Sequence, residues 1–141
     1  MPWVSDLEAG EVGVSQVPDV ALRRGKILVA EGRWDEAATL LLTTIEAAEA
    51  EPPGSLAETW SLRFELARLT ARRGELAAAL PRLESARARA VTLWGDAAWE
   101  VIRTHAALAE LCSALGQLDD VARWSALLPG DGPQPQGFLD H

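Results

Sequence analysis

The stretch Glu31-Gly32-Arg33-Trp34-Asp35-Glu36-Ala37 decides the fold, because its pattern recurs at residues 73–79 and 115–121. Each copy has a glycine, then any residue, a large apolar residue, two polar or small residues, and a small or β-branched apolar residue. The glycines stand 42 residues apart in both steps. A fixed period of about 20 to 50 residues is typical of repeat proteins, so the chain is predicted to be built from repeated units.

A second break in the pattern has the same period. Pro53-Gly54 and Gly95-Asp96 also stand 42 residues apart, and one more step back reaches residues 11–13, where Gly13 lies. The predicted units are therefore about 11–52, 53–94 and 95–136. Ala, Leu, Glu and Arg dominate the chain and Tyr is absent, which favours helix over strand. Each unit is predicted to be a helix-turn-helix hairpin, and the whole chain to be all-α.

Local signals predict where the helices begin and end. Ser55 with Glu58 three residues later is a capping box, Asp96 is a predicted N-cap, and Pro81 predicts a kink or a late helix start. Gly25, in the middle of the first helix, predicts close approach of another helix. The expected helices run from about 18 to 31, 34 to 50, 55 to 73, 75 to 94, 96 to 115 and 117 to 128.

These signals divide the chain into three parts. Residues 1–14 are poorly determined by the sequence, and residues 15–128 carry the helical repeats. The run from Pro129 to Gly137 is rich in proline and glycine, so residues 129–141 are predicted to form a disordered tail.

Charge and composition exclude several classes of function. The net charge is −8 and the pI about 4.7, which argues against nucleic acid or an anionic membrane as the main partner. The single cysteine, Cys112, excludes an intramolecular disulfide and any multi-cysteine metal site. The N-terminus shows no signal peptide, and no apolar run approaches the roughly 18 residues of a membrane span. A cytoplasmic location is expected.

No pattern in the sequence points to catalysis. His105 and Cys112 are seven residues apart on one helical face and are interpreted as a core histidine and a small buried thiol. The acidic pairs at 35–36 and 119–120 lie in first helical turns, where carboxylates complement the helix dipole. Phosphate loops, nucleophile elbows and metal-ligand spacings are absent from the sequence. The chain is therefore predicted not to be an enzyme, with no cofactor and no metal.

The repeated positions resemble those of the tetratricopeptide repeat family. That family places a small residue in the first helix, a glycine at the turn, then an aromatic residue or leucine, then alanine. Here those places hold Gly25, Gly32, Trp34 and Ala37, then Ala67, Gly74, Leu76 and Ala79, then Ala109, Gly116, Leu118 and Val121. The 42-residue unit is longer than the standard 34 residues and is similar to the variety found in kinesin light chains and in bacterial regulatory and scaffold proteins. Arg24, Val121 and Ser125 depart from the pattern, as is common in terminal repeats.

The resemblance implies a short right-handed α-solenoid of three stacked hairpins, whose first helices line a concave groove. A groove of this kind binds a partner protein or peptide. Five cations there, on an acidic chain, favour an acidic peptide or a C-terminal carboxylate, with Arg68 and Arg72 as a clamp. The alternative interpretation is ordinary solvated helix faces paired with acidic neighbours. By position, the predicted groove residues are Arg23, Lys26, Phe64, Arg68, Arg72, Arg103 and Glu110.

Two alternative functions remain open. In the first, the chain forms a homodimer through Trp124, Leu127 and Leu128, which the sequence leaves without evident cover, as it does Phe138. The interpretation of Trp124 as solenoid core is equally open. In the second, the groove holds a small molecule or a signalling peptide, so that the chain is a sensor subunit.

Overall fold

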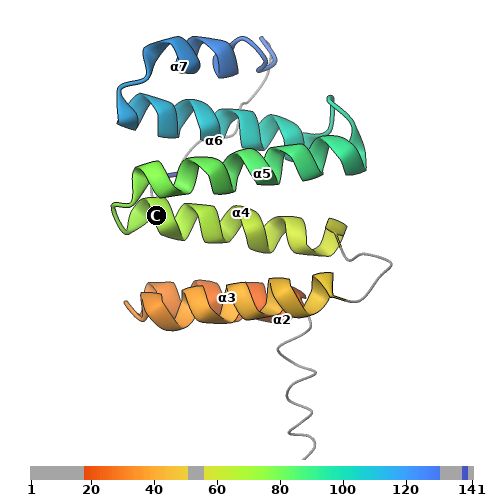
Figure 1. Cartoon of the computed structure of the whole chain (residues 1–141), viewed down its shortest axis with the longest axis vertical. Coiled ribbons are helices and arrows are strands. Elements are labelled where there is room, and N and C mark those ends of the chain that lie inside the picture. The colour runs from red at the N-terminus through yellow and green to blue at the C-terminus, as the bar shows by residue number, and fades with distance from the viewer. Residues whose placement is uncertain (1–17, 51–55, 131–137, 140–141) are drawn as a thin grey trace, which may run out of the picture. The chain divides into compact units, whose positions relative to one another are not determined.

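The described part of the chain is entirely helical. A computed structural model describes residues 18–50, 56–130 and 138–139, and within them six helices and no strand are present (Figure 1). The chain divides into two compact units, unit 1 (residues 1–66) and unit 2 (residues 67–141). The helices are α2 (Pro18–Ala30), α3 (Trp34–Glu49), α4 (Leu56–Arg72), α5 (Leu76–Trp94), α6 (Trp99–Leu115) and α7 (Leu118–Ser125).

The 42-residue period is present in the backbone as three copies of one helix-ending turn. Gly32, Gly74 and Gly116 have φ values of +79°, +90° and +79°, the left-handed conformation that glycine adopts without steric penalty. In each copy the N–H of the next residue donates to the carbonyl five residues back, and the glycine N–H donates three residues back. This is the Schellman arrangement that satisfies the last carbonyls of a helix. The prediction that these glycines end helices is confirmed.

In unit 1, helices α2 and α3 pack against each other. A Cβ added at Gly25 would lie 3.1 Å from Leu41 Cδ2, so the missing side chain lets the second helix approach closely, as predicted. Leu41 is fully buried at this contact. At the turn between the two helices, Trp34 Nε1 donates to the carbonyl of Val29 at 3.0 Å.

A polar contact joins α3 to the first half of α4, also within unit 1. The Glu49 carboxylate accepts hydrogen bonds from Arg63 Nε at 2.8 Å and from the Thr59 hydroxyl at 3.0 Å. Because all three side chains are at least partly buried, this group ties the first half of α4 to the end of α3.

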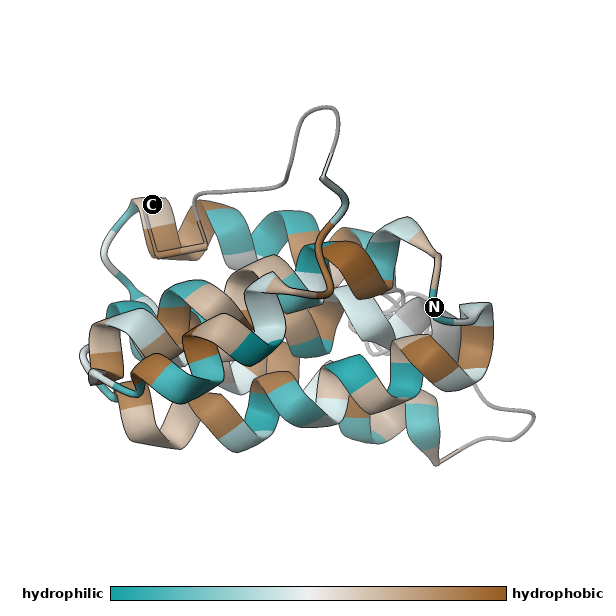
Figure 2. Ribbon diagram, turned by 90° about the horizontal axis from the view of Figure 1, so that it is seen from above, coloured by the Kyte–Doolittle hydropathy of each residue, from teal (hydrophilic) through white to brown (hydrophobic). Residues whose placement is uncertain are grey.

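In unit 2, α6 packs against both α5 and α7, and Figure 1 shows the three helices side by side in chain order. Figure 2 shows apolar and polar segments alternating along each helix, as expected for helices with one buried face. The buried apolar side chains of these three helices are Ala79, Leu83, Ala86, Ala90, Val101, Ala106, Ala107, Leu108, Leu111, Cys112 and Trp124.

One predicted helix start is wrong, and one of the two outcomes predicted for Pro81, a late helix start, does not occur. The N-cap of α6 is Ala98, with extended backbone angles and no side-chain cap bond, and not Asp96. Gly95, at φ +88°, is followed by a turn that Ala98 N–H closes onto the Gly95 carbonyl, so the helix can begin only after it. Helix α5 includes Pro81 in its interior and does not start late. Pro81 and Ala77 are both exposed, so water can satisfy the Ala77 carbonyl that Pro81 leaves without a helical donor.

Other predictions lie outside the described residues. These are the predictions for segment 1–14, the cap at Ser55, the glycine at 13 and most of the tail. Helix α7 is short and ends at Ser125, with a turn following it.

Candidate functional site

The candidate site is the surface of unit 2 that holds Phe138 and Leu139. The sequence predicted a disordered tail from residue 129, but these two residues are placed against the helices, and Phe138 is only 5% exposed. They are also the only large apolar residues after Leu128. The pair was the one signal in the sequence that could have predicted this contact.

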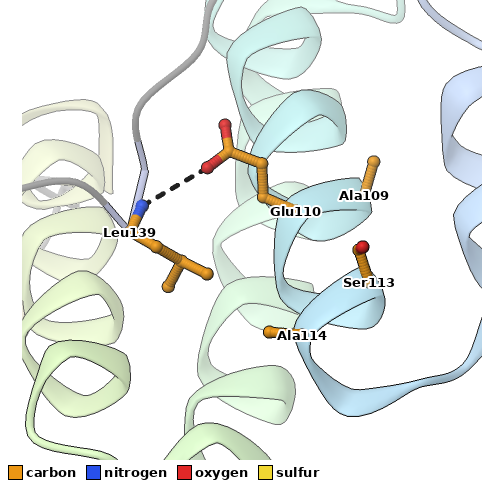
Figure 3. Close-up of a pocket in the computed structure, with 5 residues that line it drawn as sticks. All are labelled: Ala109, Glu110, Ser113, Ala114 and Leu139. Atoms are coloured by element: carbon orange, nitrogen blue, oxygen red, sulfur yellow. Dashed lines mark hydrogen bonds between the residues drawn. The ribbon is translucent and has the colours of Figure 1, made fainter.

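Two side chains hold opposite edges of a single peptide unit. Arg68 Nε, near the end of α4, donates to the Phe138 carbonyl oxygen at 3.0 Å. The Leu139 N–H donates to Glu110 Oε1 on α6 at 3.3 Å (Figure 3). In a trans peptide the C=O and N–H point in opposite directions, so a donor and an acceptor on either side satisfy both groups. Through these two hydrogen bonds this arrangement, the Arg68–Glu110 clamp, binds peptide backbone.

The two clamp residues occupy equivalent positions in successive repeats, because Arg68 and Glu110 are 42 residues apart. Both were predicted as groove residues from their place in the repeat, and the structure brings both to one segment of chain. The difference in their charge gives the clamp its polarity. A guanidinium donates only and a carboxylate accepts only, so the carbonyl of a bound peptide unit faces Arg68 and its N–H faces Glu110.

An open pocket lies beside the clamp. It has a volume of about 460 Å³ and is lined by Glu110, Leu139 and three small α6 residues, Ala109, Ser113 and Ala114. Figure 3 shows Leu139 on one side of the pocket and the α6 residues on the other. Leu139 therefore lies at the edge of a space that would accept a larger side chain.

The remaining predicted groove residues are distributed over both units. In unit 2, Arg72 and Arg103 are half-buried. In unit 1, Arg23 and Lys26 are exposed, whereas Phe64 is buried with its ring centroid 5.2 Å from that of Trp60. Phe64 therefore serves as packing in this structure, whereas Arg68 and Glu110 hydrogen-bond to the Phe138–Leu139 segment.

Of the two interpretations of Trp124 that the sequence left open, the structure favours the core, and Phe138 is covered as well. Trp124 is 3% exposed, and its ring stacks on that of His105 with centroids 5.5 Å apart. The Arg87 and Arg123 guanidinium carbons lie 5.1 and 4.4 Å from the ring centroid, which is cation–π distance. Of the predicted oligomer contacts, Leu128 is half-buried.

His105 and Cys112 are both buried, as the core interpretation predicted. Burial, with a further contribution from Arg87, lowers the pKa of His105. Arg87 Nε donates to His105 Nε2 at 2.8 Å, which requires the neutral ring. Burial also raises the pKa of the Cys112 thiol, with smaller contributions from Asp120 and Glu84. A thiolate–imidazolium pair would need the histidine pKa raised and the cysteine pKa lowered. Both shifts found here have the opposite sign.

The fold and the site together define an all-helical, repeat-like protein with a segment of its own chain bound by a backbone clamp. No family model, no curated protein and no solved structure matches the chain. None of the helices in the described part of the chain is long and apolar enough to cross a membrane. Nor do three or more His, Cys, Asp or Glu side chains gather as a candidate metal site within the residues that the structure covers.

Proposed function

We propose that this chain is a non-catalytic, cytoplasmic protein–protein interaction module of the tetratricopeptide type, which binds a short segment of a partner protein at the Arg68–Glu110 clamp. The observation that carries the proposal is the clamped Phe138–Leu139 peptide unit. A surface that satisfies both polar groups of a peptide bond removes the main obstacle to burying an extended chain, since unpaired backbone groups are costly.

The charge around the clamp favours an acidic partner segment. Arg72 and Arg103 are half-buried residues of the same unit, on the two helices that carry the clamp. In the chain's own sequence the clamped pair is followed by Asp140. The arginines would attract an acidic segment to this surface, whereas the rest of the chain, whose net charge is −8 overall, would repel it.

The test is a selection of random twelve-residue peptides on the full chain carrying Phe138→Asp, which removes the buried aromatic ring from the clamp. The enriched peptides are then measured against the same chain with Arg68→Ala and Glu110→Ala added. Tenfold weaker binding is expected. The matched control is Arg82→Ala with Glu84→Ala, two exposed residues of α5, which should leave affinity unchanged. Enriched peptides that bind the clamp variant as tightly as its parent would refute the proposal.

Self-association through α7 is a second candidate, and the exposed apolar side chains of this region favour it. Leu118 is 72% exposed and Leu127 is 49% exposed. Light scattering coupled to size exclusion would measure the mass of the wild type and of Leu118→Glu with Leu127→Glu. A dimer that the two substitutions split supports this function, and a monomer of the wild-type chain at high concentration contradicts it.

A further inference from the structure

The bound segment of the chain shows what kind of ligand the clamp accepts. It has three features: an aromatic side chain that is almost completely buried, one peptide unit held at both edges, and an aliphatic side chain at the rim of an open pocket. The two hydrogen bonds orient the clamped amide. In the bound segment the aromatic residue precedes this amide and the aliphatic residue follows it. A peptide unit turned over so that its N–H faced Arg68 would find no acceptor there.

We infer that the partner segment carries an aromatic–aliphatic pair, and that the chain's own Phe138–Leu139 segment competes for the same clamp in cis. This inference rests on the proposed function, because it names the ligand class and the regulation of that site. The clamp would then be closed in the free protein and would open to a partner segment that binds more tightly than the tail.

The length of the tail makes this competition effective. Seven residues separate Gly130 from Phe138, and tethers of this length give effective concentrations in the millimolar range. For a segment with an intrinsic dissociation constant on the order of 0.1 mM, a tether at about 1 mM would keep roughly nine clamps in ten occupied. The apparent affinity for a partner segment would fall about tenfold by the same arithmetic.

The pocket beside Leu139 explains how a partner could prevail over the tail. Leu139 lies at the edge of this pocket of about 460 Å³, and small residues form the α6 side of the pocket. A partner segment with a larger apolar residue at this place would bury more surface without disturbing the clamp. The tail is therefore a weaker version of the preferred ligand, as a reversible competitor must be.

The experiment uses a fluorescein-labelled peptide of residues 134–141 as the probe, and fluorescence anisotropy with three full-length chains. These are the wild type, Phe138→Asp, and Phe138→Asp with Arg68→Ala and Glu110→Ala. We expect Phe138→Asp to bind the probe at least tenfold more tightly than the wild type, and the triple variant to lose that binding. A second probe carrying Leu139→Trp should bind Phe138→Asp more tightly than the first. Circular dichroism melting of each chain shows that it is folded.

The other outcomes separate the two proposals. Equal binding of the probe to wild type and Phe138→Asp would overturn competition in cis while leaving the peptide-binding function standing. No binding to any chain would overturn the ligand class, and the function itself would then depend on the selection experiment. If the wild type is a dimer by light scattering and Phe138→Asp is a monomer, the segment binds a second copy, which also overturns competition in cis.

Discussion

Hydrogen exchange at the Leu139 amide would report directly on the clamp, because this N–H is the donor to Glu110. Three substitutions weaken the bound state through different contacts. Phe138→Ala removes the buried aromatic ring, Arg68→Ala removes the donor to the Phe138 carbonyl, and Glu110→Gln keeps an acceptor oxygen but removes its charge. Each should raise the fraction of molecules in which the segment is released.

The expected order follows from burial and distance. Burying a phenylalanine side chain contributes about 1.5–3 kcal/mol, and Phe138 is almost completely buried. The bond from Arg68 has an ordinary length of 3.0 Å, but the half-buried guanidinium is partly screened, so it contributes about 1 kcal/mol. The Glu110 bond is longer, at 3.3 Å, and losing only its charge removes about 0.5 kcal/mol. At nine-tenths occupancy Leu139 is protected only about elevenfold, and 1.4 kcal/mol is a factor of ten in the bound-to-released ratio. Leu139 protection should therefore fall about 6- to 10-fold, about 4-fold and about 2-fold.

The assay is amide exchange followed by NMR at Leu139, with each rate divided by that of the free 134–141 peptide carrying the same substitution. Glu84→Gln, on the exposed face of α5, is the matched control for Glu110→Gln and should leave protection unchanged. The reasoning is refuted if Leu139 exchanges at the free-peptide rate in the wild type. It is also refuted if Arg68→Ala reduces protection more than Phe138→Ala does, because backbone pairing and not aromatic burial would then hold the segment.

Three further predictions concern stability, measured by urea unfolding. Gly25→Ala should lower the free energy of unfolding by about 1 kcal/mol, because the new methyl lies 3.1 Å from the fully buried Leu41. The cost of this crowding exceeds the gain in helix propensity, which is about 1 kcal/mol. In a chain that also carries Leu41→Ala, the crowding is gone and Gly25→Ala should stabilise the fold. Trp124→Ala should lower the free energy of unfolding by about 3–5 kcal/mol, because the ring is buried. Leu127→Ala should lower it by about 0.5 kcal/mol or less, and equal losses in the two variants would contradict the burial of Trp124. Because the pKa of His105 is lowered on folding, the unfolded state binds the extra proton, so stability should fall as pH drops below about 6.5. His105→Asn should flatten that slope, and an unchanged slope would contradict this assignment.

The repeat turns were predictable because their physics is local. Only glycine adopts a positive φ at little penalty, and a Schellman turn closes hydrogen bonds within six residues. The 42-residue spacing of Gly32, Gly74 and Gly116 therefore predicted three structurally equivalent turns. The end of α2 came within one residue of prediction for the same reason. The Asp96 cap failed because a preference worth about 1 kcal/mol cannot move a helix start across a turn that the backbone has already closed.

The clamp could be predicted in part. The repeat register placed Arg68 and Glu110 in equivalent positions, and the family resemblance implied that such positions face a groove. Which atoms they would bind could not be predicted, because the contacts span 70 residues in one case and 29 in the other. A proline- and glycine-rich composition predicts the average behaviour of a tail and cannot reveal two residues that find partners.

Trp124 shows most directly what the sequence by itself could not decide. Its place in the repeat was compatible with either core or interface, since a lone tryptophan on a short terminal helix looks the same in both. The tertiary structure decided for the core, because α6 brings His105 and α5 brings Arg87 against its ring. The sequence determined the helices, their period and their turns, which depend on neighbours within about six residues. Only packing between helices decided which side chains are covered and what the clamp holds, because those contacts depend on residues far apart in the chain.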